Sequence, residues 1–376
     1  MKTHKPVVVY GASGYTGRLV CEYLREYAIP FVAAGRSKDK LAEAMRSHVP
    51  GIESADYELA EVEHSTEALT ALFRGASVVL NTVGPFARLG PQVVQACLAA
   101  GCHYTDTTGE QDWLIACDQQ WGERFAAAGL LLSPGLAQMY TTGEIAAQLC
   151  LQTPGLDTLD IAVFWGGSPT IASTRTILVN AATSKAYYLE QNQYKEWQPD
   201  AGLYHLAIPG QHETALALPW GGTSHPVWFR RDPRVANVKV LGGVFNRQLM
   251  LGVPQIVAAA LEATKDMDPD ARYDALSQTA AGVMNTMPPR ENPRINKSVD
   301  SVHASGPLGR AHCVIYGNCN YKQTGLLQAF AAASLLQRAP LRAGFASGCQ
   351  AFGHHELLGA LRSFGLVQPP LLSVQT

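Results

Sequence analysis

The stretch "VVVYGASGYTG", from Val7 to Gly17, decides the fold. Its apolar start is typical of a buried strand, and three glycines follow at a spacing of three, Gly11, Gly14 and Gly17. Glycines at a strand-to-helix turn can be needed only because the turn is tight, or they can let a pyrophosphate approach backbone N–H groups. The segments that follow the turn distinguish these two interpretations.

Short apolar runs alternate with helical patterns over the first third of the chain. The runs predict strands at 6–10, 31–34, 57–62, 77–83, 102–106 and 130–133. Apolar strands separated by helices predict a parallel sheet covered on both faces, so the fold class is α/β with a doubly wound Rossmann sheet. The glycine turn then lies at the carboxyl end of the first strand, where the following helix directs its positive end at a phosphate. In this context the turn predicts a dinucleotide site, with Ser13 and Thr16 as hydroxyl donors.

From about Thr153 the pattern changes to longer strands with period-2 alternation, at 156–165 and 298–321, the second with a turn at Gly306-Pro307. Loops with short strands are expected over 188–234, and helices over 253–264, 325–337 and 348–365. We therefore expect an inserted α+β domain at 137–339, built on a mostly antiparallel sheet and serving substrate binding and dimerisation. The Rossmann domain would comprise 1–136, completed by a C-terminal helix within 340–376.

The end of the second strand, "AAGRSKDK", selects the cofactor. An NAD-binding site usually places Asp or Glu there to bind the ribose hydroxyls. This chain has Arg36, whose planar fork of donors matches a 2′-phosphate, and Ser37 as a second donor. The alternative is a loop of solvated charges, for which Lys38 and Lys40 are typical. The sequence predicts NADP(H).

Polar side chains follow the later strands of the predicted sheet. Asn81 and Thr82 end the fourth strand and Tyr104 lies on the fifth, so all three are expected in the crevice at the carboxyl edge. Capping and turn chemistry would explain such residues equally well. As catalytic proton donors we consider Tyr140 and Tyr104. We prefer Tyr140 because a helix beginning near Thr142 would fix its position. The alternative is that Tyr140 is a core tyrosine whose hydroxyl is hydrogen-bonded within the protein.

Composition excludes several classes of function. A formal net charge of -2 and scattered lysines and arginines argue against nucleic acid as a partner. The chain has no apolar run long enough for a membrane span, so we expect a cytoplasmic protein. Its eight cysteines form no ligand pattern, and we expect no metal.

The chain resembles the saccharopine dehydrogenase-like family of NADP-binding oxidoreductases, and within it the trans-acting enoyl reductases. The resemblance rests on "GASGYTGRLV", "AGRS", "VVLNTVGPF", "CLAAGCHYTDTTGE" and "PGLAQMYTTGEIAA", with "YKQTGLLQAFAAASLL" and the helix containing "AFGHHELLGALRSFG" near the C-terminus. It implies a Rossmann domain, an inserted α+β domain and, by analogy alone, a homodimer. Carried over by position, the implied cofactor contacts are Gly11, Ser13, Gly14, Tyr15, Thr16, Gly17, Arg36, Asn81, Val83 and Gly84.

The substrate region matches no motif of the family. Trp165, Ser168 and Arg175 could line its pocket, and the aromatic content around residues 187–247 suggests an apolar small molecule with a carbonyl handle. Our first hypothesis is an NADPH-dependent oxidoreductase that reduces an activated C=C bond (enoyl or enone) of a hydrophobic metabolite. The alternatives are an imine or ketone reductase of saccharopine-reductase type and a non-catalytic NADP-binding sensor.

Overall fold

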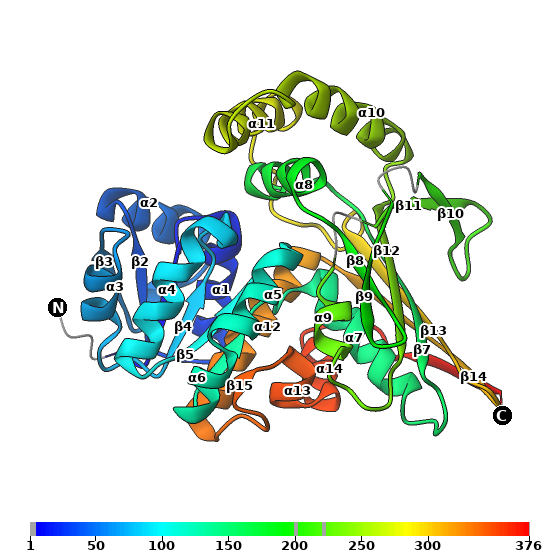
Figure 1. The fold of residues 1–376 in the computed structure, drawn as a ribbon. Helices are drawn as coiled ribbons and strands as arrows, with labels where there is room; N and C mark the ends of the chain where they lie inside the picture. The colour runs from blue at the N-terminus through cyan, green and yellow to red at the C-terminus, as the bar shows by residue number, and fades with distance from the viewer. Residues whose placement is uncertain (1–4, 199–201, 220–222, 376) are drawn as a thin grey trace. The chain divides into compact units, whose positions relative to one another are not determined.

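The computed structural model describes residues 5–198, 202–219 and 223–375, and the chain divides into two compact units (Figure 1). Unit 1 comprises Met1–Thr108, Trp113–Thr141 and Tyr321–Leu366, and unit 2 comprises Gly109–Asp112, Thr142–Asn320 and Val367–Thr376. The boundaries therefore differ from the predicted 1–136, 137–339 and 340–376. In particular, the segment after Leu366 belongs to unit 2 and not to the Rossmann unit.

Unit 1 is built on a parallel sheet to which, among the described residues, seven strands contribute in the order β15-β6-β5-β4-β1-β2-β3. The strands are β1 (Val7–Tyr10), β2 (Phe31–Gly35), β3 (Tyr57–Glu61), β4 (Val78–Asn81), β5 (His103–Asp106), β6 (Leu131–Ser133) and β15 (Gly344–Phe345). The six predicted strands and the Rossmann class are confirmed. The strand order reverses between β1 and β4, which is the place where open α/β sheets bind ligands.

The helices associated with this sheet are α1 (Tyr15–Glu26), α2 (Lys38–His48), α3 (Thr66–Phe73), α4 (Phe86–Ala100), α5 (Gln111–Gln120), α6 (Gly122–Ala127), α12 (Asn320–Gln337), α13 (Gly348–Phe352) and α14 (His354–Ser363). The core buries large side chains from strands and helices alike, including Phe31, Phe73 and Phe125. The predicted single helix over 348–365 is wrong. Gly353 has φ of 92°, which an α-helix cannot contain, and the segment is split there into α13 and α14.

Unit 2 contains a mixed sheet in the order β16-β14-β13-β7-β12-β8-β9 over the described residues. Its strands are β7 (Thr158–Trp165), β8 (Tyr187–Glu190), β9 (Gln193–Glu196), β12 (Asn237–Val244), β13 (Lys297–Ser305), β14 (Arg310–Asn318) and β16 (Leu371–Gln375). Only the β7–β12 pair is parallel among these described strands, so the prediction of a mostly antiparallel sheet is confirmed. The hairpin of β10 (Tyr204–Ala207) and β11 (Thr214–Ala217) packs its apolar side chains on this sheet at Phe164 and Val299.

The helices of unit 2 are α8 (Ile171–Thr183), α9 (His225–Phe229), α10 (Arg247–Thr264) and α11 (Pro269–Val283), and α7 (Gln138–Cys150) continues into it from unit 1. Helices α8 and α11 were not predicted from the sequence. The start of α10 was predicted at Val253, but the helix begins at Arg247, capped by Asn246, and contains Pro254 in its interior. In the described ranges we find no helix whose length and hydropathy would let it cross a bilayer.

Candidate functional site

The turn after β1 is closely packed at two of its three glycines. Gly11 has φ of 92°, its amide donates to Ala34 O at 2.9 Å, and a Cβ on it would lie 2.6 Å from Thr82 Oγ1. A Cβ on Gly17 would lie 2.3 Å from the carbonyl oxygen of Gly11. These two glycines are therefore required for the geometry of the turn itself.

Gly14 is different, because its surroundings are open. It is exposed, its φ of -72° suits any residue, and a Cβ there would meet only Gly11 O, at 3.3 Å. Gly14 is also the N-cap of α1, so it has no side chain to accept hydrogen bonds from the first helical turn, where backbone N–H groups have no intrahelical partner. Ser13, Tyr15 and Thr16 flank this opening and are half-buried. The arrangement fits a pyrophosphate at a helix N-terminus.

Arg36 follows the end of β2 and is exposed. Burial raises the pKa of Tyr10, at the end of β1, and the positive charge of Arg36 acts in the opposite direction. For His64, whose charged form is the protonated one, burial lowers the pKa, and the positive charge of Arg36 lowers it further. The positive charge of Arg36 therefore acts on Tyr10, the last residue of β1. Ser37 is the N-cap of α2, where its Oγ accepts from Lys40 N at 3.3 Å.

The segment after β4 is fixed against the turn. Thr82 Oγ1 donates to Tyr10 O or Gly11 O, at 3.0 and 3.1 Å, and Val83 N donates to Asn81 Oδ1 at 3.0 Å. A Cβ on Gly84, the next residue, would lie 3.2 Å from the ring of Phe86. The strand register places Tyr10 and Asn81 at the same level, so the ends of β1 and β4 form one edge.

Behind Asn81 lies a buried polar network. Asn81 Nδ2 donates to Tyr104 Oη at 3.1 Å, and Tyr104 Oη donates to Asp106 Oδ2 at 2.7 Å. Trp113 Nε1 donates to the same oxygen at 2.9 Å, and the amides of Thr108 and Gly135 donate to Asp106 Oδ1. Burial raises the pKa of Asp106, and these hydrogen bonds oppose that effect. Burial, and then the nearby Asp106 charge, raise the pKa of Tyr104.

The two tyrosines considered as proton donors differ in exposure. Tyr104 is 0% exposed, and its hydroxyl accepts from Asn81 and donates its proton to Asp106, both of which are buried. Tyr140 is 8% exposed and lies in the first turn of α7, which follows the carboxyl end of β6; its amide donates to Ala137 O at 3.1 Å. Both tyrosines are thus buried, Tyr104 completely and Tyr140 nearly so.

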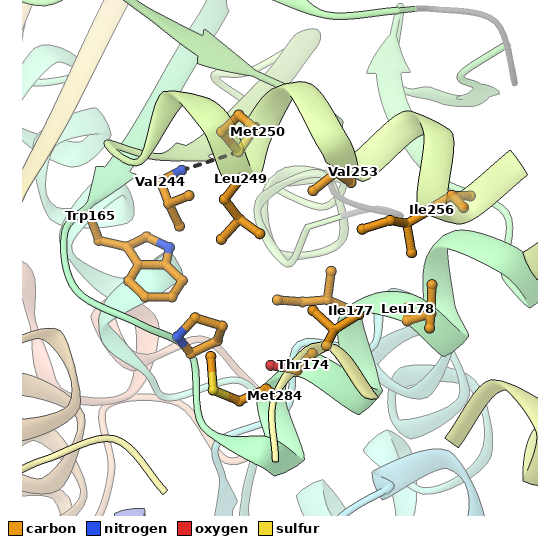
Figure 2. Close-up of a pocket in the computed structure, with 13 residues that line it drawn as sticks. Trp165, Thr174, Ile177, Leu178, Val244, Leu249, Met250, Val253, Ile256 and Met284 are labelled. Atoms are coloured by element: carbon orange, nitrogen blue, oxygen red, sulfur yellow. Dashed lines mark hydrogen bonds between the residues drawn. The ribbon is translucent and has the colours of Figure 1, made fainter. Parts of the chain in front are cut away.

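Of the three residues expected at the substrate, Trp165 lines an apolar cavity of unit 2 (Figure 2). Arg175, in α8, and the exposed Ser168 are not among the residues of its wall. The wall also includes Leu249, Val253 and Ile256 of α10, which were not among the predicted substrate residues. Their spacing of three and four in a helix with few charges is the signal that could have found them.

The described residues contain no group of three or more His, Cys, Asp or Glu side chains arranged to hold a metal ion.

Comparisons with known proteins match both halves of the chain. Residues 141–376 match the model of a family of unknown function, DUF5938, and residues 7–128 match the saccharopine dehydrogenase NADP binding domain. A solved structure, the apo histidine-tagged saccharopine dehydrogenase (L-Glu forming) from Saccharomyces cerevisiae, aligns over 98% of this chain and 100% of its own with a TM-score of 0.62. At 13% identity this likeness shows a shared fold.

Curated relatives match over a shorter segment. The "Lipid droplet localized protein" of Caenorhabditis elegans is 35% identical over 131 residues, which are 33% of this chain and 31% of the relative. The "Trans-acting enoyl reductase" of Mycobacterium tuberculosis strain H37Rv is 39% identical over 107 residues, 28% of this chain and 25% of the relative. The matches thus span no more than about a third of these relatives' length. The expected cytoplasmic location stays a prediction.

The predicted resemblance is confirmed for the first unit, which is a nicotinamide-cofactor domain of saccharopine dehydrogenase type. By the match of residues 141–376, the chain belongs to the family DUF5938.

Proposed function

We propose that the protein is an NADPH-dependent oxidoreductase that reduces an activated C=C bond, conjugated to a carbonyl, in a hydrophobic small molecule. The observation that carries the cofactor choice is an exposed Arg36 directly after β2, whose positive charge acts on Tyr10 at the end of β1, together with an open Gly14 at the start of α1. The first turn of α1 would bind the pyrophosphate, and Arg36 with Ser37 would bind the 2′-phosphate. Asn81, Thr82, Val83 and Gly84 would hold the nicotinamide ribose from the end of β4.

The enoyl part of the proposal draws on the segment shared with the enoyl reductase relative. When bound, the nicotinamide supplies a hydride to the β carbon of the acceptor. Tyr140 would deliver the accompanying proton to the α carbon, which balances the reduction. Tyr104 would act on the reaction indirectly, because it orients Asn81 and, through Asn81, the amide of Val83.

An oxidation assay separates the enzymatic hypotheses. Purified protein with NADPH is offered matched enones, imines and ketones that carry the same alkyl substituent, and loss of the reduced cofactor is followed by absorbance. Turnover of the enone is expected. Turnover confined to the imine or ketone would replace the enoyl assignment with the saccharopine-type alternative, and tight NADPH binding with no turnover of any class would favour the sensor.

Tyr140→Phe is expected to lower kcat on the enone about 100-fold, since a positioned general acid contributes about that much or more. Its Kd for NADPH should stay unchanged, because the hydroxyl contributes to proton transfer and not to cofactor binding. Rapid-mixing kinetics and a binding titration measure the two quantities.

The control for this substitution is Tyr104→Phe, which removes the hydroxyl between Asn81 and Asp106 and should lower the free energy of unfolding by about 1 to 3 kcal/mol. A Tyr140→Phe enzyme with full kcat would remove Tyr140 from the mechanism.

We also propose that the protein forms a homodimer through β16. This strand lies at the edge of the unit 2 sheet, and its side chains Leu371, Leu372 and Val374 are 60%, 45% and 44% exposed. An exposed apolar edge strand is a template for pairing with a second chain. Such pairing would cover both the free edge and its leucines.

Leu372→Asp is therefore expected to convert the dimer to a monomer in light scattering, because a buried, unpaired charge would oppose edge pairing. Leu308→Asp, in the exposed turn between β13 and β14, is the matched control and should leave the mass unchanged. A wild-type protein that is monomeric at every concentration tested would contradict the proposal.

A further inference from the structure

The start of α1 carries a cation whose side chain is held in place. Arg18 is half-buried, and its side chain folds back toward the N-terminal end of the helix, where its Nε donates to Gly14 O at 3.2 Å. The same carbonyl oxygen accepts from the amide of Arg18 at 3.0 Å. Apart from the bond to Gly14, we find no hydrogen bond or ion pair of this side chain among the residues that the structure describes. Both Nη groups are thus left for a ligand.

Two tyrosines support the guanidinium. Its Cζ lies 5.9 Å from the centre of the Tyr15 ring, within the range of a cation–π contact. The Tyr15 ring packs edge-on against the ring of Tyr321 in α12, with 5.2 Å between the ring centres. One turn further along α12, a Cβ on Gly325 would lie 2.9 Å from the backbone carbonyl carbon of Leu19, so the two helices approach closely here. The position of Arg18 is therefore fixed by the packing of α12 on α1.

Electrostatics at this position favour an anion. The N-terminal end of a helix carries a partial positive charge, which disfavours a cation near the first turn and favours a negative group. The first turn of α1 contains no acidic residue. Burial lowers the pKa of Arg18, an effect that Tyr15 opposes, and a guanidinium stays charged nevertheless. The guanidinium and the helix dipole would therefore attract the same anion.

We propose that Arg18 binds the pyrophosphate of the nicotinamide cofactor, with its Nη groups on the phosphate oxygens. A guanidinium offers two parallel donors, which match two oxygens of a phosphate group. The two arginines would then bind different parts of the cofactor: Arg36 the 2′-phosphate, and Arg18 a part that NADPH and NADH share. The inference rests on the proposed binding of a dinucleotide at the glycine turn, but it requires neither the choice of NADP nor a particular reaction.

Binding titrations with four ligands test this division. Arg18→Gln should weaken the binding of NADPH, NADH and ADP-ribose by the same factor, about tenfold or more, since all three contain the pyrophosphate and a charge-assisted hydrogen bond contributes about that much. Adenosine 2′-monophosphate has no pyrophosphate and should bind with wild-type affinity. Arg18→Lys should recover part of the loss, because it keeps the charge but not the fork of donors. Calorimetry measures each Kd without substrate or turnover.

A salt series separates a charge contact from a merely structural role of Arg18. The Kd of the wild type for NADH should rise with salt more steeply than that of Arg18→Gln, because salt screens the charge pair that the variant lacks. The matched control is Arg74→Gln, which removes one positive charge from an exposed position between α3 and the amino end of β4. It should leave the four Kd values and their salt dependence unchanged.

Unchanged Kd values for NADPH and NADH in Arg18→Gln would overturn the assignment. A loss confined to NADPH would also overturn it, since Arg18 would then act on the 2′-phosphate, and so would an equal loss for adenosine 2′-monophosphate, since the substitution would then disturb unit 1 as a whole. If Arg18→Gln fails to fold, Arg18→Lys replaces it and should weaken NADPH and NADH by the same factor. A wild-type protein that binds none of the dinucleotides would overturn the proposed function together with this inference.

The two proposals fail in different ways. Equal affinity of the wild type for NADPH and NADH would contradict the role of Arg36 and leave that of Arg18 standing. Dinucleotide binding that does not depend on Arg18 would contradict this inference alone.

Discussion

Replacement of Arg36 by Asp is expected to weaken NADPH binding about 100-fold and to leave NADH binding unchanged or slightly stronger. A hydrogen bond to a charged group contributes about 1.5 to 3 kcal/mol, and the fork of Arg36 can make two with a 2′-phosphate. The new carboxylate would repel that phosphate and could instead accept from the ribose hydroxyls of NAD. Fluorescence titrations of the wild type and the variant with both cofactors measure the change.

The neighbouring Lys38 provides the control for this experiment. Its side chain is also positive and exposed, but it lies in the first turn of α2, and its amide donates to Glu61. Lys38→Asp changes the net charge by the same amount and should alter NADPH affinity far less. Equal losses in the two variants would mean that general electrostatic attraction, and not a contact of Arg36, selects the cofactor.

The second large effect concerns the glycine turn. Gly17→Ala should mainly lower the free energy of unfolding, whereas Gly14→Ala should mainly weaken NADPH binding. A Cβ at residue 17 would lie 2.3 Å from Gly11 O and 2.8 Å from Ala12 Cα, both backbone atoms that cannot move aside easily. This overpacking should lower the free energy of unfolding by about 3 kcal/mol or more. Thermal or urea unfolding measures it.

Gly14→Ala should fold with a loss of about 1 kcal/mol or less, since its φ is ordinary and its only close neighbour is at 3.3 Å. It should nevertheless bind NADPH at least about tenfold more weakly, because the methyl group would occupy the space of the pyrophosphate. If Gly14→Ala binds NADPH normally, the turn is a structural feature and not a phosphate site.

Sequence reasoning predicted unit 1 well because its signals are local. A strand such as Val7–Tyr10 is a continuous apolar run, and the glycines that follow it leave few conformations for the turn. Strand β15 was missed because two residues show no periodicity. Gly353 looks like an ordinary residue of an amphipathic helix, and only its φ of 92° reveals the break between α13 and α14.

Unit 2 was less predictable because its site depends on tertiary packing. Trp165 could be selected as a candidate from the sequence, but nothing local connects it to Val253 or Met284, which line the same cavity and are far away along the chain. A helix was expected from Val253, but α10 begins at Arg247, where Asn246 Oδ1 accepts from Leu249 N, and Pro254 lies inside it. In unit 1, the hydrogen bond from Tyr104 to Asp106 likewise could not be predicted from the sequence, since polar residues at the end of a strand also fit turn chemistry.

The central claim is that the open turn and Arg36 together bind NADP(H). It is tested most directly by titrating the wild-type protein with NADPH and with NADH under the same conditions, without any substrate. NADPH is expected to bind about 100-fold more tightly than NADH. Equal affinities, or tighter binding of NADH, would contradict it.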